Sequence, residues 1–292
     1  MIGAMVIGGI GNQMFQYAAA RALALSRRTE LMLDLSAFRR PDQFGIMRSF
    51  ELDRLAIRVR EPSSLSPLSF MLARRSAPAL RALSGWQIAR ERSLAYDPRF
   101  PAFPDRTYLA GYWQSWRYFE AAAERIHEEL QPRAPLSAAS LRLQERMRGS
   151  PSLSLHVRRG DYVTSPGVTE FHGVLELDYY REAIRLVQGR IRDLRAFVFS
   201  DDLEWCRRAF EPLGLDLTFV DCNQDADSWQ DIHVMAACRH SIIANSSFSW
   251  WGAWLGDRGG GAGDRMVVAP LRWFVSADVP VADRFPPGWT IL

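Results

Sequence analysis

The chain of 292 residues contains no lysine: all 36 of its basic side chains are arginine. Without a lysine amine, the protein cannot form the Schiff base on which pyridoxal-phosphate enzymes depend. A P-loop is excluded too, because the lysine of that motif contacts the bound phosphates. Any phosphorylated ligand must therefore be bound by arginine side chains and backbone N–H groups.

Cysteine, long apolar runs and net charge are also scarce. The three cysteines have no C-x-x-C spacing, which is typical of a reduced, cytoplasmic compartment. No run reaches the roughly eighteen apolar residues of a membrane span. A net charge of +3 gives no reason to expect nucleic-acid binding. With 48% hydrophobic residues, the chain can fill one large core or two of ordinary size.

Strand and helix patterns alternate along the sequence, which predicts an α/β fold. The chain opens with a predicted strand, a glycine turn, a helix and a second strand, at residues 5–7, 8–11, 12–24 and 31–35. The proline-rich residues 131–135 break the pattern. We therefore expect two α/β domains, residues 1–135 and 136–292, that face a cleft suited to a ligand.

The most specific chemistry follows a predicted strand at residues 152–157. Arg158 and Arg159 come directly after it, where ligands bind in open α/β sheets. Two guanidinium groups at this point can bind a phosphate or a carboxylate through paired hydrogen bonds. His156 and Asp161 beside them can transfer protons or hold a polar substrate. The alternative is a surface ion-pair cluster that caps the strand.

The glycine turn at residues 8–11 indicates a second binding element. Gly9 and Gly11 fit the start of a dinucleotide-binding fingerprint, but Met14 occupies the third glycine position, where helix and strand must approach closely. Asn12 instead places an amide at the start of a predicted helix. That arrangement suits a hydroxyl-rich or phosphorylated ligand better than a nicotinamide dinucleotide.

Two pairs of aspartates lie in predicted loops. Asp201 and Asp202 directly follow a predicted strand at residues 196–199. Asp225 and Asp227 resemble the D-x-D motif of metal-dependent sugar transferases. Hard cations need several oxygen ligands, however, and this second pair lies in a polar loop. We therefore favour a solvated loop and predict no metal site.

A tryptophan-rich helix is predicted after a late strand. Ser246 and Ser247 precede it, where free N–H groups bind anions, although an ordinary N-cap explains one of the two serines. We expect Trp250, Trp251 and Trp254 to pack in the core rather than to form a sugar-stacking platform.

Three motifs occur in a fixed order: Gly-Gly-Ile-Gly-Asn-Gln-Met-Phe-Gln-Tyr at residues 8–17, His-Val-Arg-Arg-Gly-Asp-Tyr at 156–162 and Asn-Ser-Ser-Phe-Ser-Trp-Trp-Gly-Ala at 245–253. Together they resemble the bacterial α-1,2-fucosyltransferases of glycosyltransferase family 11. The resemblance implies a GT-B-like pair of Rossmann-type domains and GDP-β-L-fucose as the donor. It also implies inversion at the anomeric carbon, no cofactor and no required metal. Donor binding is expected in residues 136–292 and acceptor binding in residues 1–135.

The same resemblance implies roles for single residues. Arg158 corresponds to the arginine on the donor β-phosphate, supported by Arg159. His156 and Asp231 correspond to contacts with the guanosine. Asn12 corresponds to an asparagine close to the reacting centre. The other residues expected at the donor are Asp201, Asp202, Ser246, Ser247, Gly9 and Gly11.

The general base that activates the acceptor hydroxyl has three candidates. Glu170 resembles a glutamate that follows the double-arginine motif in related α-1,6 enzymes, although its spacing differs. Asp161 lies so close to Arg158 and Arg159 that its pKa should be lowered, which weakens it as a base. His172 can accept a proton near neutral pH. We assign the base to Glu170 and keep Asp161 and His172 as alternatives.

The sequence therefore predicts an enzyme that transfers L-fucose from GDP-β-L-fucose to the 2-hydroxyl of a terminal β-galactoside, in surface-glycan or oligosaccharide synthesis. One alternative is a nucleotide-dependent oxidoreductase built on the N-terminal glycine turn. Another is a non-catalytic glycan-binding protein.

The expected partners are GDP-fucose and an acceptor glycan, either free or lipid-linked. A lipid-linked acceptor would bring this cytoplasmic protein to the inner face of the cell membrane. Residues 70–86 mix apolar and basic side chains, as helices at a membrane surface do. A solvated arginine face is the preferred interpretation of that segment, with peripheral membrane contact as the alternative.

Overall fold

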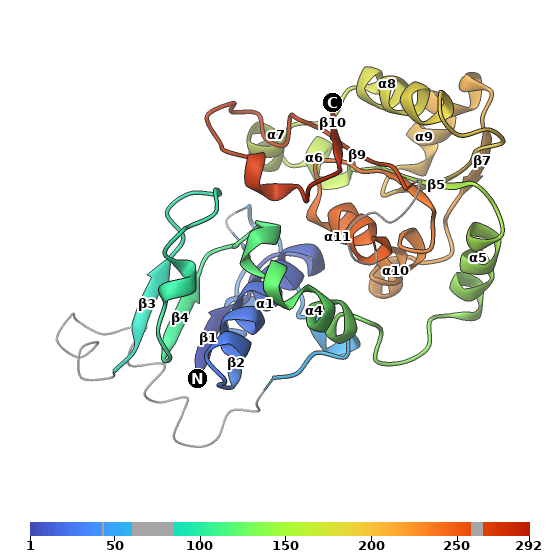
Figure 1. Ribbon diagram of the computed structural model, residues 1–292. Helices are drawn as coiled ribbons and strands as arrows, with labels where there is room; N and C mark the ends of the chain where they lie inside the picture. Colours follow the sequence, from blue (N-terminus) through green and yellow to red (C-terminus); the bar gives the residue numbers. More distant parts are fainter. Residues whose placement is uncertain (43, 60–84, 258–264) are drawn as a thin grey trace. The chain divides into compact units, whose positions relative to one another are not determined.

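The computed structural model describes residues 1–42, 44–59, 85–257 and 265–292 (Figure 1). The chain forms two compact units, residues 1–133 with 280–285 and residues 134–279 with 286–292. The segment proposed for membrane contact, residues 70–86, lies outside the described residues except for its last two. Within the described ranges, none of the helices combines the length and the apolar character needed to cross a bilayer.

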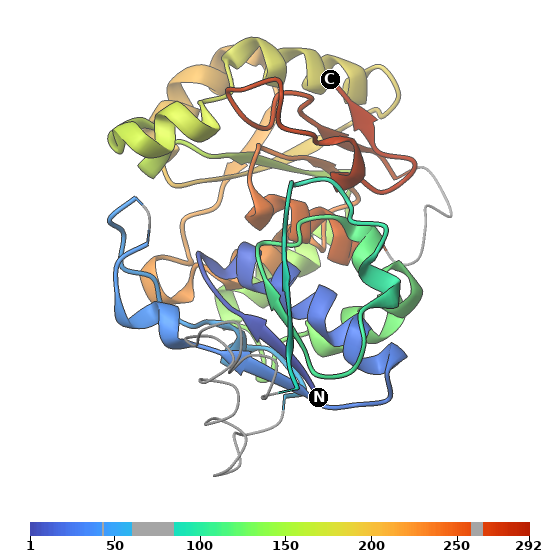
Figure 2. The ribbon, with the colours of Figure 1, turned by 90° about the vertical axis from the view of Figure 1, so that its left-hand side faces the viewer.

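The first unit contains a four-stranded parallel sheet in the order β2-β1-β4-β3. Its strands are β1 (Ile2–Met5), β2 (Leu31–Asp34), β3 (Gln87–Arg90) and β4 (Thr107–Ala110). Its α-helices are α1 (Ile10–Ser26) and α4 (Ala123–Glu129), and short 3-10 helices span Ser36–Arg39, Leu52–Arg54, Phe100–Ala102, Trp116–Tyr118, Glu120–Ala122 and Ala282–Arg284. Helix α1 packs against this sheet (Figures 1 and 2). It carries a set of fully buried alanines, Ala18, Ala19, Ala20 and Ala24.

The start of the chain differs from the sequence-based prediction. The first strand is Ile2–Met5 rather than residues 5–7, and α1 begins at Ile10 instead of Asn12. The apolar run at residues 1–7 fits a strand in more than one position, and the turn decides between them. Gly8 adopts a φ of +78°, which ends the extended segment and leads through Gly9 into the helix.

The second unit contains a six-stranded parallel sheet in the order β10-β9-β8-β5-β6-β7. Its strands are β5 (Ser152–Val157), β6 (Arg195–Ser200), β7 (Asp216–Phe219), β8 (His240–Ile242), β9 (Val267–Ala269) and β10 (Thr290–Ile291). Numbered along the chain within this unit, the strands lie in the order 3-2-1-4-5-6 from β7 to β10. This is the strand order of the Rossmann fold, in which the direction of winding reverses between the first and fourth strands, here β5 and β8.

Helices cover both faces of this second sheet (Figures 1 and 2). They are α5 (Ala138–Arg148), α6 (Gly160–Thr164), α7 (Pro166–His172), α8 (Leu177–Gln188), α9 (Leu203–Phe210), α10 (Gln230–Met235) and α11 (Ser247–Gly256), with 3-10 turns at Glu211–Leu213 and Asp225–Asp227. Along β6, Ala196 and Val198 pack in one core cluster with α8 and α9, whereas Phe197 and Phe199 pack in another with α5 and α10. The strand is thus buried on both faces, as parallel sheets require.

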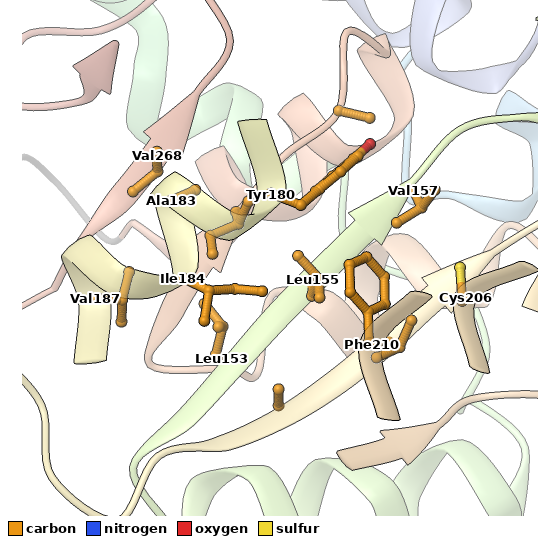
Figure 3. Packing of buried hydrophobic residues seen from close by; sticks show 14 of the residues in the cluster. Leu153, Leu155, Val157, Tyr180, Ala183, Ile184, Val187, Cys206, Phe210 and Val268 are labelled. Atoms are coloured by element: carbon orange, nitrogen blue, oxygen red, sulfur yellow. The ribbon is translucent and has the colours of Figure 1, made fainter. Parts of the chain in front are cut away.

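The alternating side chains of β5 separate its two faces. Leu153, Leu155 and Val157 belong to the core cluster that they share with α8 and α9, shown in Figure 3. His156 lies on the opposite face, where its ring centroid is 5.8 Å from that of Phe248 on α11. The predicted strand therefore sends its last polar side chain toward the helix that carries the third sequence motif.

The tryptophans of α11 belong mainly to the core, as the sequence predicted. Trp250 and Trp251 are both 0% exposed, and Trp254 is partly exposed with its ring stacked on Trp250. The indoles therefore stabilise the helix position instead of forming an open platform.

Candidate active site

The second and third sequence motifs meet at the point where the second sheet reverses its winding. Strand β5 ends at Val157 and leads into the double arginine, while β8 ends at Ile242 and leads toward α11. The two strands are neighbours in the sheet. The hydroxyl of Tyr162 donates to the backbone carbonyl of Asn245 at 3.1 Å, which joins the two segments. In open α/β sheets, ligands bind beyond the strand ends at such a reversal.

Arg158 is held by two carboxylates. Its Nη2 lies 2.6 Å from Asp161 Oδ1, and its Nη1 lies 2.8 Å from Asp201 Oδ2. The guanidinium carbon also lies 5.5 Å from the ring centroid of Tyr162. The side chain nevertheless remains 28% exposed. Arg158 is thus fixed in orientation by two ion pairs, and its side chain stays partly exposed.

Arg159 is engaged differently. Its Nε donates to Asp202 Oδ2 at 3.1 Å, and its guanidinium lies 4.3 Å from the ring centroid of Trp205. Asp202 also caps α9 by accepting from the Trp205 N–H at 3.0 Å. That N–H and the charge of Arg159 hold the pKa of Asp202 below its ordinary value. Arg159 therefore braces the start of α9 within the same cluster.

Gly160 allows the close approach of the two strand ends. Asp201 accepts from the backbone N–H of Arg159 at 2.8 Å in addition to pairing with Arg158. A Cβ atom at residue 160 would lie 2.5 Å from Asp201 Oδ2. A side chain here would push Asp201 away from Arg158. The need for glycine was not recognised from the sequence, although the residue lies inside the second motif.

His156 is a buried, neutral imidazole. It is 5% exposed, and burial, reinforced by the positive charge of Arg158, lowers its pKa to about 3. Its Nδ1 has no hydrogen-bond partner among the described residues. A buried polar atom without a partner is costly, so this nitrogen is suited to a ligand or to an ordered water.

Asp231 lies on α10, and the pKa of its carboxyl group is raised. Burial raises its pKa to about 7, and a hydrogen bond of 2.7 Å from Asn223 Nδ2 opposes that rise. Asn223 in turn exchanges hydrogen bonds with Ser140. Within the described part of the chain, these bonds connect Asp231 to α5 and not to the arginine cluster. Asp231 can thus exist in either protonation state near neutral pH.

The two serines before α11 have separate positions. Ser246 is the N-cap, accepting from the Phe248 N–H at 3.3 Å, which accounts for one serine as the sequence suggested. Ser247 occupies the first turn and is partly exposed. The N-terminus of α11 offers backbone N–H groups that favour an anion.

The three candidates for the general base have different surroundings. Asp161 is committed to its ion pair with Arg158. His172 stacks in parallel on Tyr162, with ring centroids 4.8 Å apart. Glu170 is exposed on α7, and its carboxylate makes no hydrogen bond or ion pair within the described ranges. Asp161 and His172 are thus brought next to the arginine cluster, whereas Glu170 is not tied to it.

The remaining predicted residues belong to the first unit. Gly9 is the N-cap of α1, and Gly11 and Asn12 lie in its first turn. Asn12 Oδ1 accepts from Gln114 Nε2 at 2.6 Å. A side chain is excluded at residue 8 but not at residue 9. A Cβ at Gly8 would lie 2.6 Å from Asn12 Nδ2, whereas a Cβ at Gly9 would have no atom within 4 Å.

The aspartates of the D-x-D sequence lie apart from the arginine cluster in the chain, in the loop after β7. Asp225 and Asp227 are exposed in a short 3-10 turn. Over the described ranges, no group of three or more histidine, cysteine, aspartate or glutamate side chains is arranged to hold a metal ion.

Comparisons with known proteins agree with the motifs. The chain is 32% identical over 98% of its length to an α-1,2-colitosyltransferase of Escherichia coli, which it covers to 97%. It is also 32% identical over 91% of its length to the O-antigen biosynthesis glycosyltransferase WbnK of Escherichia coli, covering 93% of that protein. A galactoside α-(1,2)-fucosyltransferase 1 of Saimiri sciureus is 27% identical over 97% of the chain and 72% of the relative.

Among solved structures, the fucosyltransferase NodZ from Bradyrhizobium matches with a TM-score of 0.50 at 16% identity, over 86% of this chain and 91% of that one. This likeness concerns the fold alone, and it confirms the predicted GT-B-like class with a parallel α/β sheet in each unit. The sequence profile described as glycosyl transferase family 11 matches residues 89–291. The resemblance seen in the three motifs is thereby confirmed, and the chain belongs to glycosyl transferase family 11.

Proposed function

We propose that the protein is an inverting galactoside α-1,2-fucosyltransferase that moves L-fucose from GDP-β-L-fucose to the 2-hydroxyl of a terminal β-galactoside. Family membership supports glycosyl transfer, and the relative from Saimiri sciureus is named for this linkage. The observation that carries the proposal is Arg158, fixed by Asp161 and Asp201 at the reversal of the second sheet. Family membership does not favour an oxidoreductase or a non-catalytic glycan-binding protein.

The chemistry of the cluster suits the departure of GDP. Cleavage of the bond between sugar and phosphate builds positive charge on the sugar ring and negative charge on the leaving diphosphate. A guanidinium that is already oriented can stabilise the diphosphate without reorganising during the reaction. The N–H groups at the start of α11, near Ser247, can add to this stabilisation. We propose that these groups replace a metal ion.

The donor is assigned to the second unit and the acceptor mainly to the first, with Asn12 close to the reacting sugars. The neutral ring of His156 and the carboxylate of Asp231 are proposed to contact the guanosine. Asp201 is proposed to hold the phosphate-binding Arg158 in place beside the donor. Arg159 and Asp202 are proposed to support the donor site by bracing the start of α9. This division follows the position of the arginine cluster in the unit with the Rossmann strand order.

The acceptor is proposed to be a glycan of surface-polysaccharide synthesis. The relative WbnK is named for O-antigen biosynthesis. If this glycan is lipid-linked, the enzyme works in the cytoplasm at the inner face of the membrane. A free β-galactoside such as lactose would then still serve as a simplified acceptor.

The test is transfer from labelled GDP-fucose to lactose, followed by linkage analysis of the product. An α-1,2-fucosylated product is expected, together with release of GDP. GDP-colitose is the informative second donor, because a similar protein is named as a colitosyltransferase. If transfer occurred only from GDP-colitose, the proposed α-1,2 linkage would stand, but colitose would replace fucose as the transferred sugar. If neither GDP nor GDP-fucose raised the melting temperature while NAD did, the proposal would be wrong.

A further inference from the structure

The loop between β7 and α10 contains a buried polar side chain. Asn223 is 7% exposed, whereas the residues on either side, Cys222 and Gln224, are exposed. Burial of an amide is unfavourable unless hydrogen bonds within the protein replace its hydrogen bonds to water. The buried position of Asn223 in an exposed loop therefore indicates that its side chain has specific partners.

The amide of Asn223 joins two helices of the second unit. Its Nδ2 donates to Asp231 Oδ1 on α10 at 2.7 Å and to Ser140 Oγ on α5 at 2.9 Å. Its Oδ1 accepts from Ser140 Oγ at 3.0 Å. Ser140 is 0% exposed, and α5 packs against α10. Both ends of the amide are thus engaged within this unit.

The orientation of the Asn223 amide follows from its partners. An ionised carboxylate can only accept, so the NH₂ group of Asn223 must face Asp231. The amide oxygen then faces Ser140, whose hydroxyl can donate to it. Ser140 Oγ also lies 3.0 Å from the hydroxyl of Ser137, the N-cap of α5, which can donate to it in turn. Two serines at the start of α5 thus hold the amide with its NH₂ group toward Asp231.

The second oxygen of Asp231 is available to a ligand. Oδ1 receives the hydrogen bond from Asn223, and with respect to the described residues Oδ2 takes part in no hydrogen bond or ion pair. The side chain is partly exposed. The hydrogen that Asn223 directs at Oδ1 disfavours a proton on that atom, so a protonated Asp231 would carry its hydrogen on Oδ2. Oδ2 therefore changes from acceptor to donor when the carboxyl group takes up a proton.

Among the described residues, no positive charge stabilises the ionised form of Asp231. Burial raises its pKa to about 7, and the hydrogen bond from Asn223 opposes this rise. The ionisable side chain beside the pair is Cys222: desolvation, and after it the charge of Asp231, raises the pKa of this thiol. Helix α11 has no ionisable side chain, and the shift of Asp231 has no contribution from those on α5 and α10, which are Arg142, Glu145, Arg146, Arg148 and His233. Asn223 thus has the part that a cationic side chain has beside many carboxylates.

A guanine base presents two adjacent donors on one edge, its N1–H and its exocyclic NH₂ group. An ionised carboxylate can accept from both, one at each oxygen, because each oxygen has two acceptor positions and Asn223 uses one of those on Oδ1. Hypoxanthine lacks the exocyclic NH₂ group, and adenine has an unprotonated N1. A protonated Asp231 would direct its own hydrogen at one of the guanine donors. The ionised form therefore favours guanine over these two purines.

We infer that Asn223 is a positioning residue that keeps Asp231 as a double hydrogen-bond acceptor and so selects guanine among the purine bases. The inference rests on the proposed GDP-fucose donor and on the proposed contact of Asp231 with its base, because it states how that base is distinguished. Asn223 needs no contact with the nucleotide itself. Ser140 supports it by fixing the direction of the amide.

Asn223→Leu tests this role, because it keeps a side chain of similar size and removes the donor to Asp231. The probe for the exocyclic NH₂ group is inosine diphosphate (IDP), which carries hypoxanthine. In calorimetry at pH 8, the wild type should bind GDP at least about tenfold more tightly than IDP, since one hydrogen bond to a charged group is lost with IDP. This ratio should fall by about threefold or more in Asn223→Leu. The pH below which GDP binding weakens should move upward, and affinity should recover toward pH 9.

A purely structural role predicts a different pattern. Ser140→Ala removes the support from α5 but leaves the NH₂ group beside Asp231, so it should lower the melting temperature and keep the ratio of GDP to IDP affinity and the pH profile. Gln224→Leu, at the exposed neighbouring position, is the matched control and should change none of these quantities. If Asn223 only packed the loop, Ser140→Ala would alter GDP binding as Asn223→Leu does, and a higher pH would restore nothing.

Asn223→Ser decides the matter if Asn223→Leu does not fold, because its hydroxyl can still bond to Ser140 but is too short to reach Asp231. A folded variant with the wild-type affinity ratio and pH profile would overturn the inference, and so would a wild type that binds GDP and IDP equally. The proposed function would survive either result if the wild type transfers fucose from GDP-fucose to lactose. Absence of that transfer would reject the proposed function itself.

Discussion

Arg158 Nη1 and Asp201 Oδ2 lie 2.8 Å apart and connect the carboxyl ends of the neighbouring strands β5 and β6. The same carboxylate accepts from the backbone N–H of Arg159 at 2.8 Å. Asp201 therefore controls both the backbone after β5 and the direction of the guanidinium. Asp201, which the sequence predicts to lie at the donor, is thus also a support for the residue that is proposed to bind the phosphate.

Arg158→Lys should lower kcat/KM by about 100- to 1000-fold, which is typical when one preorganised donor to developing negative charge is lost. Lysine retains the charge but cannot bridge Asp161 and Asp201 with a planar fork. Steady-state kinetics measure the loss of activity, and thermal melting shows separately whether the fold is kept. Arg195→Lys, in an exposed ion pair with Asp216, is the control and should change neither. Activity of Arg158→Lys within a few-fold of the wild type would contradict the assigned role.

Asp201→Asn should mainly raise the KM for GDP-fucose, by roughly tenfold, because Arg158 loses one of two charged partners. The effect on kcat should be smaller, since Asp161 still holds the other edge of the guanidinium. Gly160→Ala should act in the same direction by displacing the Asp201 carboxylate. Asp216→Asn serves as the control at an exposed ion pair. An unchanged KM in both Asp201→Asn and Gly160→Ala would show that Arg158 needs no such support.

Asp231 should make stability depend on pH. Its pKa is raised from 3.8 to about 7 in the folded protein, so the folded state binds this proton more tightly than the unfolded chain. The resulting contribution to the free energy of unfolding is fully present below about pH 4 and is lost as the pH rises toward 7. In urea titrations at pH 5 and pH 8, Asp231→Asn should lose less stability between the two conditions than the wild type. An equal loss of stability in both proteins would show that a group other than Asp231 causes the pH dependence.

The same carboxyl should make GDP binding depend on pH. If Asp231 accepts hydrogen bonds from the guanine, it must be ionised, and GDP should bind more weakly as the pH falls below about 7. Calorimetry in buffers of different ionisation enthalpy should detect proton release on binding near pH 6.5. GDP binding by Asp231→Asn should be weaker and flat over this range. Wild-type affinity that is independent of pH would argue against contact with the guanine.

The sequence predicted the residues of the arginine cluster better than the contacts between them. The alternating pattern of residues 152–157 located β5, and the polar residues after it were placed correctly at a strand end. Asp201 could not be paired with Arg158 in advance, because the pairing depends on β5 and β6 being neighbours in the sheet. The helix that begins after Asp202 was missed, although an aspartate before an amphipathic segment is an N-cap signal.

The first unit shows where local patterns fail. The apolar run at its start fits a strand in several positions, and the turn at Gly8 decided the matter. Gln114 carries no local signal at all: its partner Asn12 is 102 residues away, and a glutamine after a strand is unremarkable in sequence. Hydrogen-bond chains between distant segments are determined by tertiary structure, so sequence periodicity cannot reveal them.

Activity should survive removal of divalent metal ions. Arg158 and the N-terminus of α11 are proposed to stabilise the leaving diphosphate, and the exposed pair Asp225 and Asp227 has no assigned role. The initial rate in EDTA should therefore stay near its untreated value. The double variant Asp225→Asn with Asp227→Asn should also keep wild-type activity. Complete loss in EDTA that Mn²⁺ or Mg²⁺ restores would show that a metal takes part after all.

Glu170→Gln tests the assignment of the general base. The amide keeps the shape of the side chain but cannot accept a proton, so kcat should fall by about 100-fold or more while GDP affinity stays the same. Glu182→Gln, an exposed change on α8, is the control and should leave both quantities unaltered. Isothermal titration with GDP and steady-state kinetics with saturating donor separate binding from turnover.

The competing candidates make this test decisive. Asp161 is neutralised by Arg158, and His172 is stacked on Tyr162, whereas the carboxylate of Glu170 is exposed and unneutralised within the described ranges. A base must be able to accept the acceptor's proton when the sugar–phosphate bond breaks, and a carboxylate already paired with a guanidinium does so poorly. Near-normal kcat in Glu170→Gln would move the role to Asp161 or His172, and Asp161→Asn and His172→Gln would then distinguish them.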